Sequence, residues 1–328
     1  MNVGLVLTAG DAEQVERGVR AEELGYDSLW LGELWGESAV VQLAELATRT
    51  DEIALGSAIL NVYSRSPAVL AMTAASLERA SGGRFTLGIG TSTPKAIEDL
   101  HGGSFDRPVR RAHETIEIVR RFLATDGDPV DYDGVLLSVA DFPALEDSAE
   151  PTPIYHAGLG PANRRVVGRL CDGWIPHNIP FSELESAFEE VAGAARERDR
   201  DPESITVAPY VPAAVNEDRD RARRTIRRHV AYYVGSGEGY RNAVAMAYPE
   251  RADRIADAWR SGDRDEAAET VSDEMVDDLG IAATPDDARQ RLRSLVDGTG
   301  IDEPLIVLPE PAATETLEAT MTAFAPDG

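Results

Sequence analysis

The stretch Ser81-Gly82-Gly83-Arg84-Phe85-Thr86-Leu87-Gly88-Ile89-Gly90 leads from two adjacent glycines into a short, almost continuous apolar run. Apolar runs of this kind are typical of strands buried on both faces of a parallel sheet. The segment 107–123 that follows repeats apolar residues at the spacing of a helix lying on a sheet: Val109, Ala112, Ile116, Val119 and Leu123. A strand followed by such a helix is the repeating unit of a parallel α/β fold.

The same unit recurs from the first residues nearly to the last. Each predicted strand is a short apolar run, and a helical pattern separates it from the next. These strands are Val3–Thr8, Ser28–Leu31, Ile53–Ala58, Phe85–Gly90, Pro153–Ala157, Gly173–Pro176, Ile205–Tyr210 and Leu305–Leu308. Eight parallel strands predict an α/β fold of the (β/α)8 TIM-barrel type, and 328 residues are an ordinary length for one such domain with insertions.

Two stretches interrupt the alternation. Asp133-Gly134, within the segment 130–136, is the signal of a tight hairpin. From Asn216 to Leu279 the pattern is helical throughout and too long for one barrel helix. We expect residues 216–279 to form a helical insertion before the last strand of a single domain spanning residues 1–328. A separate C-terminal helical domain is the alternative, but it would leave the apolar run 304–308 without a sheet to join.

Charge is the most unusual bulk property. The 58 acidic and 32 basic residues give a formal net charge of −26, spread along the chain. Such a surface repels nucleic acid and anionic membranes. Only one of the basic residues, Lys95, is a lysine. This bias favours a proteome adapted to high salt, of the haloarchaeal type, where screening makes a strongly acidic surface tolerable. A GC-rich genome that favours arginine codons is the alternative.

The sequence also predicts a cytoplasmic protein. No stretch approaches the roughly 20 apolar residues that a membrane span needs. The N-terminus begins directly with a strand-like run, without the basic segment that precedes the apolar part of a signal peptide. Cys171 is the single cysteine, which excludes an intramolecular disulfide and fits a reducing compartment.

In a barrel of this kind the active site lies at the carboxyl ends of the strands. Function is therefore expected in the segments at the carboxyl ends of the second to sixth predicted strands. These segments are 30–37, 60–67, 88–95, 156–161 and 172–178. The five histidines do not fall in metal-ligand spacings, so no metal site is expected.

Three motifs in these segments resemble the luciferase-like superfamily, and within it the F420-dependent branch that includes methylenetetrahydromethanopterin reductase. They are Tyr63-x-Arg65-x-Pro67, the run 81–90, and Gly158-Leu159-Gly160-Pro161 followed eleven residues later by Asp172-Gly173. The likeness covers nearly the whole chain. It implies an oxidoreductase that binds coenzyme F420 and a small-molecule substrate and that forms a homodimer or higher homo-oligomer.

The resemblance also implies which residues bind the cofactor. A bulge with a cis non-prolyl peptide at Ala58-Ile59 supports the deazaflavin ring, and Asn61 reaches the ring edge. Residues 158–163 face the F420 phosphate at a helix N-terminus, although such a segment is also a plain strand-to-helix turn. The full set is Glu33, Ala58, Ile59, Asn61, Thr91, Ser92, Gly158, Leu159, Gly160, Ala162, Asn163 and His177.

Glu33, Thr93 and Lys95 are the candidate catalytic residues. The resemblance places an acid at Glu33 and a polar group at Thr93, whereas Lys95 is notable as the single lysine, just after the fourth strand. Glu33 could instead be a surface carboxylate, and Lys95 an exposed residue at a helix start. The chain departs from its relatives at Leu34, where several have histidine, and at Thr93, where the sugar-phosphate dehydrogenases have glutamate. Alcohol oxidation needs a base, so we expect hydride transfer to an electrophilic carbon, such as a methylene-tetrahydropterin C1 carrier.

Three alternatives remain open at the level of the sequence. The first is an FMN-dependent monooxygenase of the same superfamily, which needs a partner reductase and dioxygen. The second is a non-catalytic flavin- or F420-binding relative, motivated by the missing histidine and glutamate. The third is an unrelated phosphate-binding barrel such as an isomerase.

Overall fold

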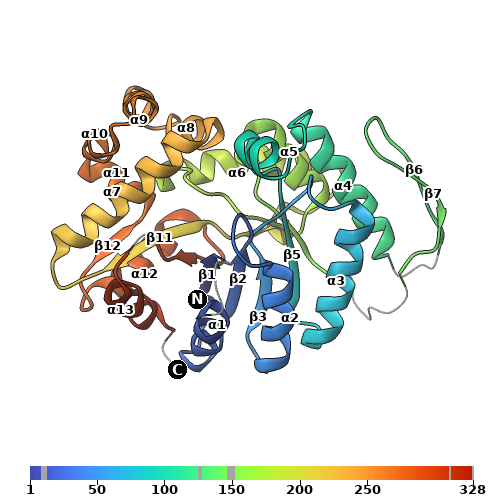
Figure 1. The fold of residues 1–328 in the computed structure, drawn as a ribbon, viewed down its shortest axis with the longest axis horizontal. Helices are drawn as coiled ribbons and strands as arrows, with labels where there is room; N and C mark the ends of the chain where they lie inside the picture. Colours follow the sequence, from blue (N-terminus) through green and yellow to red (C-terminus); the bar gives the residue numbers. More distant parts are fainter. Residues whose placement is uncertain (9–12, 125–127, 146–151, 310–311, 327–328) are drawn as a thin grey trace.

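The structure is a computed structural model that describes residues 1–8, 13–124, 128–145, 152–309 and 312–326. Strands and helices alternate along these residues, with the helices outside the strands (Figure 1). The barrel strands are β1 (Gly4–Thr8), β2 (Ser28–Gly32), β3 (Ala54–Ser57), β4 (Leu60–Asn61), β5 (Phe85–Gly90), β8 (Ile154–His156), β9 (Gly173–Trp174), β10 (Thr206–Val207), β11 (Tyr210–Val215) and β13 (Leu305–Val307). The outer helices are α1 (Glu13–Glu23), α2 (Ala39–Arg49), α3 (Pro67–Ser81), α4 (Pro108–Phe122), α5 (Pro161–Leu170), α6 (Leu184–Arg196), α12 (Ala288–Thr299) and α13 (Thr314–Phe324).

The strands close into a barrel through one split strand. Along the sheet the order is β10-β9-β8-β5-β3-β2-β1-β13-β11, all pairs being parallel. The two ends of this path, β10 and β11, are consecutive segments separated only by Ala208-Pro209. The stretch 206–215 therefore pairs with β9 at its start and with β13 farther on. The predicted TIM-barrel fold is confirmed, and each predicted strand is present within the described residues.

The barrel differs from the prediction around its seventh strand. This strand continues to Val215, five residues beyond the predicted end at Tyr210. A short strand that was not predicted, β12 (Ile281–Ala283), pairs with β11. The added part of β11, residues 211–215, contains Pro212 and two alanines, and β12 has two alanines among its three residues, so neither shows a clear β-branched or aromatic pattern.

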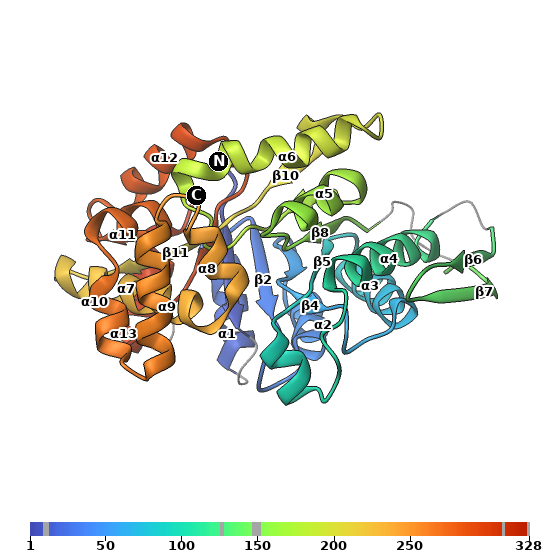
Figure 2. The ribbon, with the colours of Figure 1, turned by 90° about the horizontal axis from the view of Figure 1, so that it is seen from above.

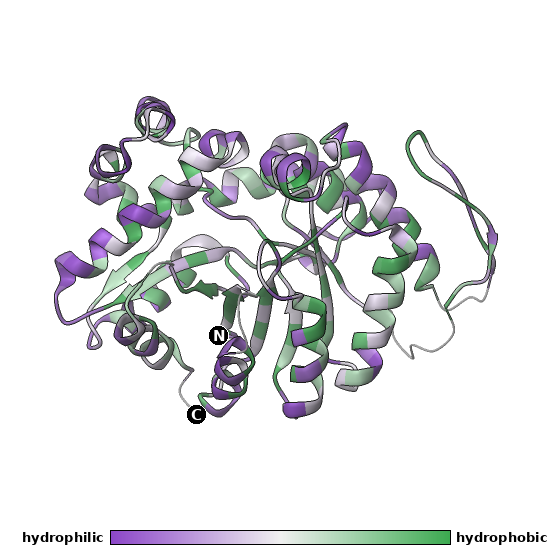
Figure 3. Ribbon diagram, viewed as in Figure 1, coloured by the Kyte–Doolittle hydropathy of each residue, from purple (hydrophilic) through white to green (hydrophobic). Residues whose placement is uncertain are grey.

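Apolar side chains fill two layers of the barrel. The larger layer lies between the strands and the outer helices and includes Leu29, Leu55 and Leu87, each fully buried. The smaller layer fills the barrel interior: Val6, Trp30, Ala58, Ile175, Ala208, Leu305 and Val307. Figure 3 shows the same arrangement, with hydrophobic strands inside and the hydrophilic residues mostly on the outer helices.

The predicted helical insertion is present. Within the fully described stretch 216–279 lie α7 (Arg219–Ser236), α8 (Glu238–Val244), α9 (Pro249–Ser261), α10 (Arg264–Thr270) and α11 (Asp273–Leu279). They pack around their own apolar cluster, which also takes in Ala214 of β11 and Ala282 of β12. In Figure 2 these helices gather on the side of the barrel away from the predicted hairpin, which is formed by β6 (Val130–Asp133) and β7 (Ser138–Phe142). Among the described residues, no helix is long and apolar enough to cross a membrane.

Candidate functional site

The third barrel strand carries a bulge at its carboxyl end. Its two parts, β3 and β4, both pair with β5, but in different registers: Gly56 lies opposite Thr86, whereas Leu60 lies opposite Ile89. Three residues, 57–59, therefore stand opposite two, 87–88, which is a β-bulge. The peptide bond between Ala58 and Ile59 is cis, as the sequence resemblance implies.

Two glycines make room for this bulge. A Cβ atom on Gly88 would lie 1.8 Å from the carbonyl oxygen of Ser57, and one on Gly32 would lie 2.9 Å from the carbonyl oxygen of Ala58. The Ser57 hydroxyl replaces the missing ladder bonds: it donates to the Gly88 carbonyl and accepts from the Gly88 N–H, both at 2.9 Å. Close backbone approach thus explains the glycine at position 88 of this run.

Tyr210 holds the bulge from the other side of the barrel. Its hydroxyl donates a hydrogen bond of 2.5 Å to the Ala58 carbonyl oxygen. Tyr210 is the first residue of β11 and was predicted only as the end of a strand. A tyrosine in an otherwise apolar strand was the available signal, but nothing in the sequence showed which carbonyl it would meet.

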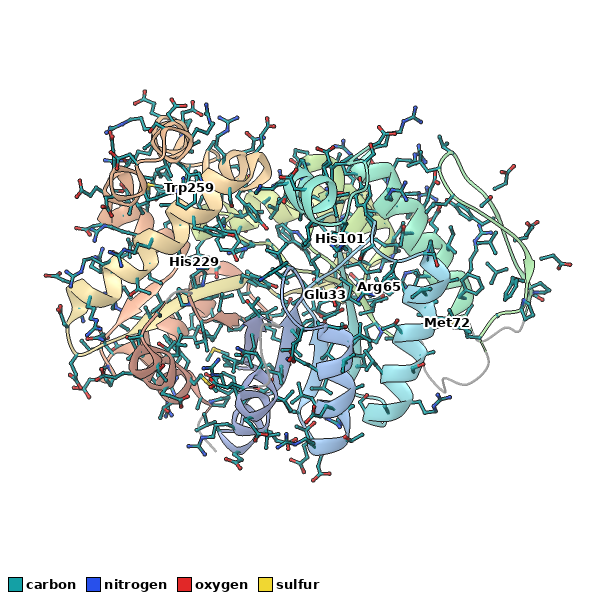
Figure 4. The ribbon with its side chains drawn as sticks, in the orientation of Figure 1. Glu33, Arg65, Met72, His101, His229 and Trp259 are labelled. Atoms are coloured by element: carbon teal, nitrogen blue, oxygen red, sulfur yellow. The ribbon has the colours of Figure 1, made fainter. Side chains whose placement is uncertain are left out.

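Glu33 is tied to Arg65. The two side chains form a bidentate ion pair, with nitrogen-oxygen distances of 2.5 and 3.0 Å, and only 16% of the Glu33 side chain is exposed. Glu33 also accepts from the N–H of Ala39 in the first turn of α2, at 3.1 Å. Figure 4 shows both side chains near the centre of the molecule. Arg65 belongs to the Tyr-x-Arg-x-Pro motif, and its ion pair with Glu33 explains why an arginine stands at this position of the motif.

Asn61 is buried and largely committed to its own loop. Its side-chain oxygen accepts from the N–H groups of Tyr63 (3.0 Å) and Ser64 (2.7 Å). Because the oxygen is occupied, the amide nitrogen is the part of the side chain left for other partners, and it lies 3.4 Å from Nε2 of His101. His101 follows a π-helical turn, Ala96–Leu100, in the loop after β5. The sequence had not singled out His101.

The loop after β5 separates the remaining polar candidates. Thr91, Ser92 and Thr93 are all partly buried, and Ser92 adopts a left-handed backbone with φ 58°. The Thr93 hydroxyl accepts from the Ala96 N–H at 3.3 Å. The Lys95 side chain is 80% exposed and pairs with Asp99 at 2.8 Å, and this hydrogen bond raises the pKa of Lys95. Lys95 therefore points to solvent rather than into the site.

The loop after β8 presents a helix N-terminus. Gly160 precedes α5, which starts with Pro161, and no side chain among the described residues caps this helix. Proline has no N–H group, so the N–H groups of Ala162 and Asn163 are the first free donors of the helix. Trp174 fixes the loop by donating from Nε1 to the Gly158 carbonyl at 2.7 Å. A Cβ on Gly239 would lie 3.8 Å from Leu159, so the start of α8 lies over this loop.

His177 lies in a buried cluster of rings. Its ring is 4.8 Å from that of Tyr210 and 4.2 Å from that of Tyr233, and its Nε2 lies 3.3 Å from Nε2 of His229 on α7. Burial, together with the charge of His229, lowers the pKa of His177 well below its ordinary value. Burial also lowers the pKa of His229 to about 3. Both imidazoles are therefore neutral at physiological pH. Among the described residues, no three His, Cys, Asp or Glu side chains form a metal site.

With this geometry established, comparison with known proteins gives a family. A protein-family model described as luciferase-like monooxygenase matches residues 4–303. The chain belongs to this luciferase-like family. It is 31% identical to the 5,10-methylenetetrahydromethanopterin reductase of Methanolobus tindarius over 280 residues, 84% of each protein.

Solved structures of two kinds share the luciferase-like fold. The coenzyme F420-dependent tetrahydromethanopterin reductase from Methanopyrus kandleri has a TM-score of 0.82 and 23% identity, covering 99% of this chain and 97% of that one. A Pseudomonas putida Baeyer–Villiger monooxygenase in complex with FMN has a TM-score of 0.69 and 18% identity, covering 99% and 96%. The more similar of these two folds is the reductase.

Proposed function

We propose that this luciferase-like protein is a coenzyme F420-dependent oxidoreductase that transfers a hydride between the deazaflavin and a small organic substrate. The observation that carries the proposal is the bulge of residues 57–59, which places an irregular stretch of backbone at the carboxyl end of a barrel strand. A planar ring needs such a surface against one face, so that the other stays open to substrate. The 31% identity to a methylenetetrahydromethanopterin reductase supports the same assignment.

The residues present fit the cofactor. The bulge residues Ala58 and Ile59 would lie under the ring, with the amide nitrogen of Asn61 at its edge. Thr91 and Ser92 would line its side. The free N–H groups of Ala162 and Asn163, next to Gly158, Leu159 and Gly160, suit a phosphate, because helix N-termini attract anions. His177 would act on the site through the cluster of rings around it, because its neutral imidazole is buried, with only 6% of the residue exposed.

Bound F420 would supply the carbon that carries the hydride. The protein then needs only to orient the cofactor and substrate, to shield them from water and to balance charge. Glu33 does this as a carboxylate neutralised by Arg65, which makes it a fixed polar wall rather than a free base. Thr93, in the loop after β5, offers a partly buried hydroxyl that already accepts from the Ala96 N–H. Leu34, 48% exposed, stands where the resemblance implies a histidine in several relatives. No base is therefore added at this position, which favours reduction of an electrophilic carbon, such as that of a methylene-tetrahydropterin, over alcohol oxidation.

A spectroscopic titration with F420, FMN and FAD in molar salt tests the cofactor. We expect tight F420 binding with a change in its fluorescence, and weak or no binding of FMN. The FMN-dependent monooxygenase is the second candidate, and the FMN complex from Pseudomonas putida favours it through the shared fold. Preferential FMN binding with flavin turnover by dioxygen would replace the proposal by this candidate. A protein that binds F420 but oxidises none of the reduced cofactor with any substrate would be the non-catalytic relative.

We further propose a homodimer formed through α2 and α3. These neighbouring helices expose three apolar side chains, Val41 (67%), Val69 (40%) and Met72 (48%), and Val69 and Met72 lie one turn apart on α3. Exposed apolar side chains on neighbouring helices can mark an interaction surface. Met72→Glu should convert the dimer to a monomer in light-scattering measurements, whereas a charge placed at exposed Val135 of the hairpin should not. A wild-type monomer would contradict the proposal.

We also propose that residues 1–328 form one domain, in a cytoplasmic protein of a salt-adapted organism. The insertion shares its apolar cluster with β11 and β12, which supports a single cooperative unit. Differential scanning calorimetry should then give one transition. The charge of −26 and the near-absence of lysine support adaptation to salt.

A further inference from the structure

We propose that Tyr210 is a positioning residue of the cofactor site, whose hydroxyl ties the bulge of residues 57–59 to the opposite wall of the barrel. This inference rests on the proposed function, because it assumes that the bulge carries a bound ring. It adds a residue that lies 152 positions away from the bulge in sequence.

The tie spans the full width of the barrel. In the sheet order, β3 and β11 are separated by β2, β1 and β13 on one side. On the other side β5, β8 and β9 separate β3 from β10, the first part of the same split strand. The third and seventh barrel strands therefore face each other. Ala58 and Tyr210 both belong to the apolar layer that fills the interior between them.

The Ala58 carbonyl has a defined place because contacts to both the N–H and the carbonyl of this residue hold it. The N–H of Ala58 donates to the Leu31 carbonyl at 2.8 Å, which fixes one side of the residue. Gly32 leaves the space into which the carbonyl oxygen points. The Tyr210 hydroxyl then supplies the donor that this buried oxygen needs. Since the carbonyl belongs to the peptide plane shared by Ala58 and Ile59, holding the oxygen fixes the orientation of the backbone that would face the cofactor.

The donor is itself held in place. The Tyr210 N–H donates to the Pro176 carbonyl at 2.9 Å, and its ring packs against His177, which is enclosed by His229 and Tyr233 of the insertion. Burial raises the pKa of Tyr210 well above its ordinary value, so the hydroxyl stays protonated and can donate. The insertion thus reaches the bulge through a chain of packed rings that ends in one hydrogen bond.

Tyr26 provides a matched control. Its hydroxyl also donates to a buried backbone carbonyl, that of Met321 at 2.8 Å, but the bond joins the start of β2 to α13, away from the bulge. Tyr26→Phe and Tyr210→Phe each remove one oxygen atom and one hydrogen bond of the same type. Both variants should lower the melting temperature by a few degrees, since a net hydrogen bond contributes modestly to stability.

The experiment measures F420 affinity and the spectrum of bound F420 for the wild type and both variants in molar salt. We expect Tyr210→Phe to weaken F420 binding about three- to tenfold and to shift the absorbance or fluorescence of the bound cofactor. Tyr26→Phe should leave both unchanged. With a saturating substrate, Tyr210→Phe should raise the KM for F420 more than it lowers kcat.

The outcomes separate this inference from the proposed function. If the wild type binds no F420, the proposed function fails. If the wild type binds F420 and Tyr210→Phe binds it with the same affinity and spectrum, the positioning inference is wrong while the function stands. Equal weakening in Tyr26→Phe and Tyr210→Phe would also overturn it, because the effect would then be one of general stability.

Discussion

At the scale of single residues, the candidate site depends on two glycines that carry no Cβ atom. Gly32 and Gly88 are neither in tight turns nor at positive φ, yet each faces a carbonyl oxygen of the bulge too closely for a Cβ atom. Ser57 then supplies hydrogen bonds that the irregular strand would otherwise lack. The bulge is therefore specified by its neighbours on β2 and β5 as much as by its own residues.

Gly88→Ala should damage the bulge severely. The added methyl group would lie 1.8 Å from the Ser57 carbonyl oxygen, a backbone atom that cannot move aside without displacing the bulge. We expect a loss of stability of about 3 kcal/mol, at the upper end of the range for overpacked core sites, together with loss of F420 binding. Gly193→Ala on α6 is the control, because no atom lies within 4 Å of its added methyl group. Helix propensity should make that variant slightly more stable. Urea unfolding of both variants tests the contrast, and two equal midpoints would contradict it.

Glu303 should make stability depend on pH. Burial raises the pKa of Glu303 above its ordinary value, although a hydrogen bond from Ser28 opposes the effect. The folded state thus favours the neutral acid. Its contribution to stability is complete below the pKa of an unfolded glutamate, about 4.3, and is lost as the pH rises through the folded value. Glu303→Gln should therefore stabilise the protein near pH 7 and change little near pH 4.

Glu22 supplies a control of opposite sign. Desolvation raises its pKa, but hydrogen bonds from the N–H groups of Ile53, Glu52 and Asp51 outweigh this, and the net pKa is lowered. Its carboxylate therefore stabilises the folded state above the ordinary glutamate pKa. Glu22→Gln should destabilise the protein at pH 7, where Glu303→Gln stabilises it. Unfolding free energies at pH 4 and 7 measure both, and the same sign for the two variants at pH 7 would contradict the burial argument.

At the scale of strands and helices, the sequence predicted the repeated strand–helix units and missed local features such as short strands and individual side-chain pairs. The run Phe85–Gly90 was located correctly because its apolar pattern is set by burial on both faces. β12 was missed, since one isoleucine and two alanines carry too little pattern. The cis peptide at Ala58-Ile59 was predicted only through family resemblance, because nothing in those two residue types demands it. Pairings such as Glu33 with Arg65, or Tyr210 with Ala58, depend on register and barrel closure and could not be predicted.

The hairpin of β6 and β7 should depend on one carboxylate from α4. Glu114, with 1% of its side chain exposed, accepts from the N–H groups of Val135, Leu136 and Leu137 in the hairpin loop, each at 2.9 Å. Glu114→Ala would leave these donors without their acceptor. We expect hydrogen exchange of the three amides to accelerate about tenfold or more, because each lost bond weakens local protection. F420 affinity should not change.

Glu117, one turn farther along α4, is the control for the hairpin. It accepts from the hydroxyl of Tyr132 at 2.6 Å and contacts no backbone N–H of the loop in the described residues. Glu117→Ala should therefore leave the exchange of the loop amides nearly unchanged. If both variants accelerate exchange to the same extent, the hairpin is held by packing on α4 as a whole rather than by the Glu114 carboxylate.

At the scale of the whole molecule, the helical insertion of residues 216–279 contacts the barrel at the candidate functional site. Besides the ring cluster around His177, a Cβ on Gly237 would lie 3.7 Å from Thr93, and one on Gly239 would lie 3.8 Å from Leu159. The start of α8 thus approaches the loops after both β5 and β8. Sequence differences within the insertion should accordingly alter which substrates fit, while the bulge on the far wall of the barrel remains the same.

The net charge should make the stability of the protein depend on salt. A charge of −26 opposes the compact state through repulsion that acts beyond contact distance. Salt also weakens the attractive surface pairs, such as Arg49 with Glu16, but exposed pairs of this kind contribute only about 0–1 kcal/mol each. Raising KCl from 0.1 to 2 M shortens the screening length from about 10 Å to below about 3 Å. Salt should therefore weaken the net repulsion more than it weakens the surface ion pairs. We expect the urea midpoint to rise with KCl, and to rise similarly with CsCl because screening is not ion-specific. A midpoint that falls with KCl would show that the surface pairs outweigh the net repulsion, and would remove the physical basis for a salt-adapted protein.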